Sequence, residues 1–198
     1  GSDLDYYDEG AFLADSPEKL PMVCASRPLF EGVLRDRLAA RDNVEIRDTT
    51  RFRTYTTDET ESAGGTATTV DGVVVETDDG DERELAADLT VDATGRRSRT
   101  PQWLADHGYE APPTEEVGVD LAYSTVVVDR PPETQRAVLV SPVPPETRGG
   151  TVIPIEDDGW LVTLFGLHGD HPPDDPDGLQ EFAGSLPADA IASVLDSR

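Results

Sequence analysis

Between residues 26 and 43 the apolar residues recur at the spacing of an α-helix, whereas from Val44 onward they mostly alternate with polar residues. Ser26 is a candidate N-cap, Pro28 is tolerated in the first helical turn, and Asn43 is a natural stop. One clear helix followed by alternating segments excludes an all-helical chain and favours an α+β fold. Five apolar side chains fall on one arc of the helix: Leu29, Phe30, Val33, Leu34 and Leu38.

The alternating segments predict two separate sheets. Between residues 44 and 86, short strands divided by acidic turns predict a β-meander, and residues 87–91 predict a further strand that returns after it. Residues 117–165 predict a second, mostly antiparallel sheet, with a hairpin turn at residues 156–159.

Shorter elements flank these sheets. Residues 4–13 predict a β-hairpin, residues 102–107 a short helix, and residues 179–195 two short helices that are split at Pro187. We therefore expect three parts of the chain: residues 1–19, whose hairpin joins the second sheet; residues 20–101, with the helix, the meander and the returning strand; and residues 102–198, with the second sheet.

The chain carries 41 acidic residues against 16 basic ones, a formal net charge of −25, and its one lysine is Lys19. A disordered acidic chain would have a similar charge, but apolar segments with clear periods along the whole sequence exclude that class. In molar salt the Debye length is about 3 Å, which screens the self-repulsion of so acidic a surface. The composition therefore predicts a halophilic protein, and it argues against nucleic acid or an anionic membrane as a partner.

The sequence also favours a cytoplasmic protein without an integral membrane segment. No apolar run approaches the roughly 20 residues that a transmembrane helix needs, and no signal peptide is visible. The single cysteine, Cys24, excludes an internal disulfide and is typical of a cytosolic protein.

Asp92, Ala93, Thr94 and Gly95 form the most informative motif. They follow the strand predicted at residues 87–91, and Gly95 has no Cβ that would keep a ligand away from the backbone. Ligands of open α/β sheets bind beyond the carboxyl ends of the strands, so this turn is a candidate binding site. An ordinary junction between a strand and a turn is the alternative.

A second candidate is Arg27, in the first turn of the predicted helix. The positive end of the helix dipole disfavours an arginine there, which indicates an anionic partner such as a phosphate. Pairing with nearby acidic side chains is the alternative.

The order of these motifs resembles the middle part of FAD-dependent monooxygenases, a family that includes aromatic hydroxylases, polyether epoxidases and the related geranylgeranyl reductases. The resemblance rests on Arg27 with the leucines of the helix, on the meander, and on the segments 91–95 and 98–101. The runs at residues 98–104 and 169–173 are similar to those of the epoxidase and hydroxylase branch.

This resemblance implies a cofactor site and a substrate site. Arg27 would reach the flavin cofactor FAD, and Asp92 to Gly95 would lie against its nucleotide part. Residues 20–101 would be a partial FAD-binding domain and residues 102–198 a substrate-binding domain. Three aromatic residues would line an apolar pocket, although a plain core position is the alternative for each: Tyr123, Trp160 and Phe165.

The resemblance further implies an oxidoreductase, and in particular a monooxygenase that acts on an apolar organic substrate. Reduced FAD would form a hydroperoxide that delivers one oxygen atom, so the cofactor carries the chemistry and no catalytic side chain needs to be visible. Arg96, Arg97 and Arg99 form a basic cluster that we expect to pair with the acidic surface, and contact with the phosphate of NAD(P)H as electron donor is the alternative. Two other functions stay open: a flavin-dependent reductase of isoprenoid lipids, and a non-catalytic β-sheet binding domain.

Two motifs of the family are absent from the sequence. No Gly-x-Gly-x-x-Gly pattern follows a first strand, and the glycine pairs at residues 64–65 and 149–150 do not fit it. Gly169-Asp170 does not match the late Gly-Asp motif, because two prolines follow and the segment is predicted as a loop. We therefore expect the natural protein to extend at both ends, and the 198-residue chain alone to hold no stoichiometric FAD and to be inactive.

Other kinds of site are disfavoured. No serine hydrolase elbow is present, and no metal is expected. A solvated acidic loop explains one cluster better than a metal site does: His168, Asp170, His171, Asp174 and Asp175.

The charge predicts how salt acts on stability. With a net charge of −25, the folded chain should be destabilised at low ionic strength, where the repulsion between carboxylates is not screened. The melting temperature, followed by circular dichroism, should rise between low salt and molar potassium chloride. A flat or falling curve would contradict the halophilic interpretation.

Overall fold

The computed structural model describes residues 4–13, 23–62, 65–132, 134 and 136–196. The chain divides into two compact units, one of residues 1–38 with 117–198 and one of residues 39–116. A six-stranded mixed sheet, a separate three-stranded sheet and several helices confirm the predicted α+β fold class. No helix in the described ranges is long and apolar enough to cross a membrane.

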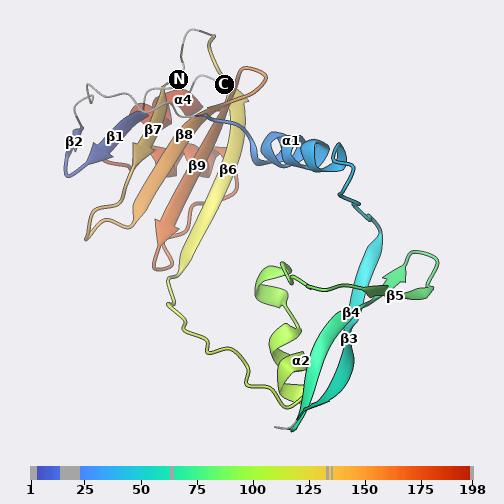
Figure 1. Ribbon diagram of the computed structural model, residues 1–198. Helices are drawn as coiled ribbons and strands as arrows, with labels where there is room; N and C mark the ends of the chain where they lie inside the picture. Colours follow the sequence, from blue (N-terminus) through green and yellow to red (C-terminus); the bar gives the residue numbers. More distant parts are fainter. Residues whose placement is uncertain (1–3, 14–22, 63–64, 133, 135, 197–198) are drawn as a thin grey trace. The chain divides into compact units, whose positions relative to one another are not determined.

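The first unit is built on the six-stranded sheet (Figure 1). Its strands, in the order in which they lie side by side, are β2 (Ala11–Phe12), β1 (Leu4–Asp8), β7 (Ala137–Val140), β8 (Arg148–Ile155), β9 (Gly159–Leu167) and β6 (Leu121–Asp129). Neighbouring strands are antiparallel, except that β1 and β7 are parallel. The prediction of a mostly antiparallel second sheet is therefore confirmed, and the N-terminal hairpin pairs with it.

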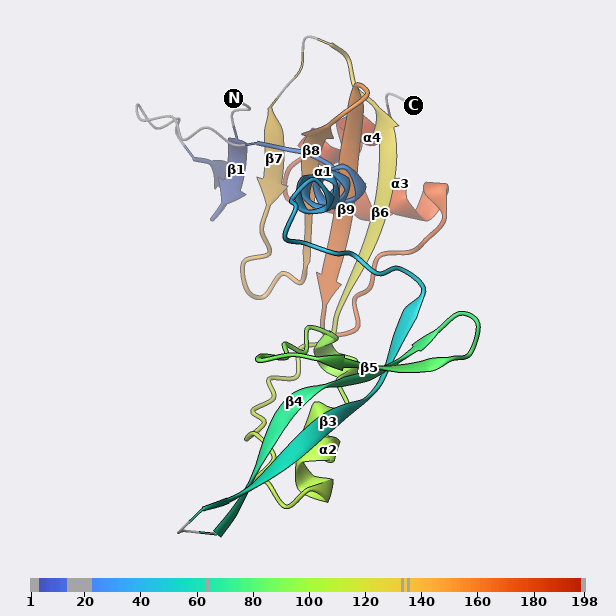
Figure 2. The ribbon, with the colours of Figure 1, turned by 45° about the vertical axis from the view of Figure 1, so that its right-hand side comes forward.

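Two short helices, α3 (Pro176–Gly184) and α4 (Ala190–Leu195), cover one face of this sheet (Figure 2). Asp175 is the N-cap of α3, since its side chain accepts a hydrogen bond from Gly178 N at 2.9 Å. The core between the helices and the sheet consists of buried apolar side chains, among them Val140, Val152, Val162, Leu164, Phe182 and Ile191.

Helix α1 (Arg27–Ala39) belongs to the first unit up to residue 38 and ends before the predicted stop at Asn43. Ser26 is its N-cap, because the Ser26 hydroxyl accepts a hydrogen bond from Leu29 N at 3.2 Å. The carboxylate of Glu156, in the predicted turn between β8 and β9, accepts bonds from Ser26 N at 2.9 Å and from the Ser26 hydroxyl. No residue of α1 is buried, so its apolar arc is exposed.

The second unit contains the predicted β-meander. Its antiparallel strands are β3 (Thr50–Ser62), β4 (Gly65–Thr77) and β5 (Glu82–Ala86). A short 3₁₀ turn, η1 (Gly95–Arg97), and helix α2 (Thr100–Asp106) follow. The ring of Trp103 in α2 lies edge-on to that of Tyr55 in β3, with centroids 4.8 Å apart, and this contact attaches the helix to the sheet.

Residues 87–91 do not form the returning strand that the sequence predicts. A strand exists only where its backbone groups pair regularly with a neighbouring strand. Ala87 N still donates to Asp71 O of β4 at 2.8 Å, but no described strand pairs with the rest of this segment. Leu89 and Val91 are accordingly exposed, Val91 at 76%. The apolar pattern therefore identifies an extended segment but does not provide the partner that a strand requires.

Candidate functional site

A cavity of about 700 Å³ opens in the second unit, next to the motif that the sequence singles out. Its walls are the start of β3, residues 90–94, and the side chains of Arg97 and Arg99. The volume is within the range of pockets that bind small organic ligands, roughly 300–1,000 Å³. Three of the four motif residues line this cavity together: Asp92, Ala93 and Thr94.

The carboxylate of Asp92 accepts four hydrogen bonds from its own turn. Its Oδ1 accepts from the Thr94 backbone at 2.8 Å and from the Thr94 hydroxyl at 2.6 Å, and its Oδ2 accepts from the hydroxyls of Ser98 and Thr100. The bond from Ser98, followed by those from Thr100 and Thr94, lowers the pKa of Asp92 well below its usual range. A carboxylate has about four acceptor sites, so Asp92 holds the turn in place and has no acceptor left for a ligand.

The same network reaches β3 and α2. The Thr100 hydroxyl lies 2.6 Å from the hydroxyl of Tyr55, whose ring contacts Trp103. The turn, the strand and the helix are therefore fixed to one another. The sequence offers no signal for Tyr55 as part of the site, because alternation shows which residues share a face of a strand and not which loop lies opposite them.

The backbone after Asp92 is open to a ligand. Gly95 has a φ of +71°, which favours glycine, and a Cβ there would meet nothing within 4 Å. The hydroxyl of Thr90, at the cavity wall, is buried and has no hydrogen-bond partner among the described residues. An orphaned hydroxyl, an open turn and a cavity of this size fit the nucleotide part of a dinucleotide such as FAD.

Arg27 belongs to the other unit, at the first position of α1. Its guanidinium Nε donates to Glu31 Oε1 at 2.6 Å, one helical turn later, and its side chain is 86% exposed. The pairing of Arg27 with a nearby acidic side chain, which was the alternative interpretation of the sequence, is therefore present. An exposed pair of this kind contributes only about 0.3–0.5 kcal/mol, so it does not compete strongly with an anionic ligand.

The three aromatic pocket candidates do not lie together. Tyr123 and Phe165 are opposite each other on β6 and β9, with ring centroids 6.0 Å apart, and Tyr123 is 64% exposed. Trp160 is 3% exposed and packs in the core cluster under the helices, with the guanidinium of Arg130 over its ring. Because side chains alternate along a strand, residues 160 and 165 of β9 point to opposite faces. Trp160 is therefore a core residue, and only Tyr123 and Phe165 share an accessible surface.

Gly149 supports the ring of Phe165. The two residues are paired across β8 and β9, and a Cβ at Gly149 would lie 2.5 Å from two ring carbons of Phe165. The ring therefore lies directly over the glycine backbone. In the sequence, Gly149 and Gly150 form a doublet that does not fit the glycine pattern of a nucleotide-binding loop. The packing role of Gly149 could not be predicted, because it depends on the register between β8 and β9.

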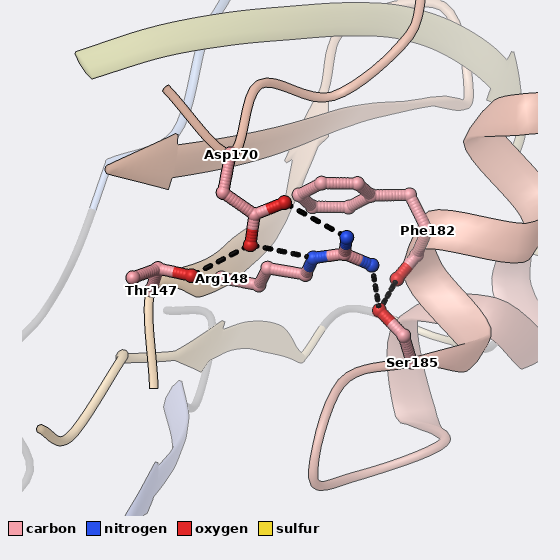
Figure 3. A network of polar contacts seen from close by, with 5 residues as sticks. All are labelled: Thr147, Arg148, Asp170, Phe182 and Ser185. Carbon is pink, nitrogen blue, oxygen red and sulfur yellow. Dashed lines mark hydrogen bonds and ion pairs between the residues drawn. The ribbon is translucent and has the colours of Figure 1, made fainter. Parts of the chain in front are cut away.

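A polar network around Arg148 connects β8, the segment after β9 and α3 (Figure 3). The guanidinium of Arg148 binds both carboxylate oxygens of Asp170 at 2.8 Å, donates to the Ser185 hydroxyl at 2.8 Å, and lies over the ring of Phe182 at 4.4 Å. The Thr147 hydroxyl donates to Asp170 at 2.6 Å. The Gly169-Asp170 segment thus supports the packing of the helices on the sheet.

Two other residues of the disfavoured metal cluster, His171 and Asp175, also have structural partners. His171 Nε2 lies 2.9 Å from Asp120 Oδ1, and Asp175 caps α3. Within the described part of the chain, no group of three or more His, Cys, Asp and Glu side chains could hold a metal ion.

The Asp170 network predicts a pH dependence of stability. The bonds from Arg148 and Thr147 lower the pKa of Asp170 from 3.8 to about 2. Because the folded pKa is depressed, the stabilisation is complete above the unfolded value and is lost as the pH falls toward 2. Asp170→Asn should therefore lower the melting temperature at pH 6 and make little difference at pH 2. An equal difference at both pH values would contradict this role of the ion pair.

Comparison with known proteins finds a curated relative by sequence and solved structures of similar fold. No family model matches the chain. Among curated proteins, the chain is 29% identical over 176 residues to Protein Rv3254 of Mycobacterium tuberculosis. The aligned region covers 87% of this chain and 37% of that protein. The chain thus spans little more than a third of the length of this relative.

Two solved structures have a similar fold. The structure of pqsL, a probable FAD-dependent monooxygenase from Pseudomonas aeruginosa, aligns with a TM-score of 0.58 and 16% identity over 99% of this chain and 52% of that chain. A flavoprotein/dehydrogenase from Cytophaga hutchinsonii aligns with a TM-score of 0.52 and 20% identity over 86% of this chain and 39% of that chain. The chain shares the fold of these flavoproteins. It corresponds to about two fifths to one half of their length.

Proposed function

We propose that this chain is part of an FAD-dependent oxidoreductase, and specifically of a monooxygenase that acts on an apolar organic substrate. The observation that carries the proposal is the turn from Asp92 to Gly95, which lies open beside a ligand-sized cavity in a fold shared with flavoproteins. In this proposal residues 20–101 belong to the FAD-binding part. Residues 102–198 form the substrate-binding part, and the hairpin of residues 1–19 joins its sheet.

The residues of the turn have different roles in this proposal. The backbone of Ala93, Thr94 and Gly95 approaches the nucleotide part of FAD, because no side chain at Gly95 obstructs it. Asp92 acts through the turn, since its four acceptor sites are already used. Arg27 reaches the cofactor from the start of α1 through a charge-assisted hydrogen bond.

The substrate contacts the face of the sheet opposite to the helices. Tyr123 and Phe165 provide an aromatic surface there, and Gly149 leaves room for the Phe165 ring beside β8. When bound, FAD supplies the electron transfer and oxygen activation, so the chain contributes position and the exclusion of water. NAD(P)H is the proposed electron donor.

Oxygen consumption by the full-length protein tests the proposal. The purified protein should carry about one equivalent of FAD by its visible absorbance, and NAD(P)H oxidation with an apolar substrate should consume oxygen. A yellow protein that reduces isoprenoid double bonds without using oxygen would instead be a flavin reductase. A colourless protein that takes up no added FAD would leave the non-catalytic binding domain as the better interpretation.

A further inference from the structure

We propose that Glu156 is a positioning residue, which fixes the first turn of α1, and with it Arg27, to the six-stranded sheet. Glu156 acts through the backbone that carries Arg27 and not by touching the cofactor. The inference rests on the proposed function, in which Arg27 binds FAD and the sheet carries the substrate surface.

The contact between Glu156 and Ser26 joins two segments that are 130 residues apart in the chain. Glu156 Oε2 accepts from Ser26 N at 2.9 Å, and Glu156 Oε1 accepts from the Ser26 hydroxyl. Ser26 in turn begins the helix, because its carbonyl accepts from Phe30 N at 3.1 Å and its hydroxyl accepts from Leu29 N at 3.2 Å. Arg27 is the next residue, so the position of its backbone follows that of Glu156.

The charge of Glu156 suits the beginning of a helix that carries an arginine. The first turn of α1 holds no acidic residue, although 41 residues of the chain are acidic. Hydrogen bonds from the Ser26 hydroxyl and the Ser26 backbone lower the pKa of Glu156, so its carboxylate is charged at neutral pH. A negative charge is favourable at a helix N-terminus. Glu156 therefore supplies, from another element, the charge that the first turn of α1 lacks.

The turn that presents Glu156 is held in place by the core of its own unit. Gly159 N donates to Glu156 O at 3.2 Å across the turn between β8 and β9. Arg130, directly after β6, donates from its backbone to Asp158 O at 2.7 Å and from its guanidinium to Asp158 Oδ1 at 3.0 Å. The same guanidinium lies over the ring of Trp160, a core residue. Glu156 is therefore a fixed support for α1.

The turn thus connects the two proposed ligand surfaces. β9 begins at Gly159 and carries Phe165 of the aromatic surface, whereas Glu156 holds the helix that carries Arg27. Hydrogen bonds weaken steeply when donor and acceptor are misaligned. Loss of the Glu156 carboxylate should therefore weaken the bond from Arg27 to the cofactor while the sheet stays folded.

A double-mutant cycle in the full-length apoprotein, with FAD binding measured by titration, tests the inference. Glu156→Gln should weaken FAD binding by about threefold to tenfold, less than the loss of Arg27 itself. In the Arg27→Ala background the same substitution should have no further effect, because no guanidinium is left to position. Ser26→Gly, which removes the hydroxyl partner of Glu156 but keeps a residue that is accepted at an N-cap, should give the same pattern.

Asp157→Asn is the matched control. It removes the same charge from the same turn, and asparagine tolerates the φ of +56° at this position. Asp157 is exposed, and FAD binding by this variant should equal that of the wild type. Thermal melts of each variant measure stability separately, because a purely structural contact would lower the melting temperature without depending on Arg27.

The outcomes separate this inference from the proposed function. Equal weakening of FAD binding by Glu156→Gln in both backgrounds contradicts the positioning role and leaves the proposed function in place. Equal weakening by Asp157→Asn and Glu156→Gln contradicts it too, because the effect would then be general electrostatics. Wild-type protein that takes up no FAD overturns the proposed function and, with it, this role of Glu156.

Discussion

Phe182→Ala should lower the free energy of unfolding of the first unit by about 3–5 kcal/mol, the usual cost of removing a buried aromatic side chain. Phe182 is 3% exposed, packs with the apolar residues between α3 and the sheet, and lies under the guanidinium of Arg148. Its loss leaves a cavity and removes a cation–π contact at once. Whole domains are stable by only about 5–15 kcal/mol, so this loss is a large fraction of the stability of the unit.

Urea denaturation followed by the fluorescence of Trp160 measures this effect. Trp160 is a core residue of the same unit, and a Trp103→Phe background removes the signal of the other tryptophan, which lies in the second unit. Phe30→Ala is the matched control, because Phe30 on α1 is 60% exposed and an exposed side chain changes stability by only about 0.5 kcal/mol. Similar losses for the two variants would show that the helices do not form the core with the sheet.

Arg27→Ala in the full-length protein should weaken FAD binding by about tenfold to a hundredfold. An arginine at the first position of α1 faces the unfavourable end of the helix dipole, and its exposed pair with Glu31 offsets only part of that cost. A charge-assisted hydrogen bond to the cofactor contributes roughly 1.5–3 kcal/mol, which corresponds to the stated range of affinity. The fold should remain, because the N-cap Ser26 and its bond to Glu156 are untouched.

Flavin fluorescence titrations of the apoprotein, with thermal melts of the same samples, measure both quantities. Arg37→Ala provides the control, because Arg37 lies in the last turn of the same helix, where a positive charge favours the helix dipole. If Arg27→Ala and the wild type bind FAD equally well, Arg27 serves only its pair with Glu31. The cofactor assignment would then rest on the turn from Asp92 to Gly95 alone.

The sequence by itself determined the elements and their class. The 3.6-residue spacing and the cap at Ser26 located α1, and the alternation with its acidic turns located the meander and the antiparallel sheet. The motif from Asp92 to Gly95 could be singled out in the sequence, because small residues after an apolar segment let a ligand approach the backbone closely. These signals are local: each depends on residues within one helix, hairpin or turn, whose spacing alone fixes the geometry.

Only the tertiary structure decided which residues share a surface. Register placed Trp160 in the core and Phe165 on the opposite face, and it set Gly149 beneath the Phe165 ring. The folding of the second unit brought Arg51 of β3 to Arg97 and Arg99, more than forty residues later in the chain. The prediction of a strand from the apolar pattern at residues 87–91 was wrong for the same reason: the pattern does not show which strand would pair with it. A strand and a pocket wall both need a partner from a distant part of the chain, and the spacing of residues within one segment carries no information about that partner.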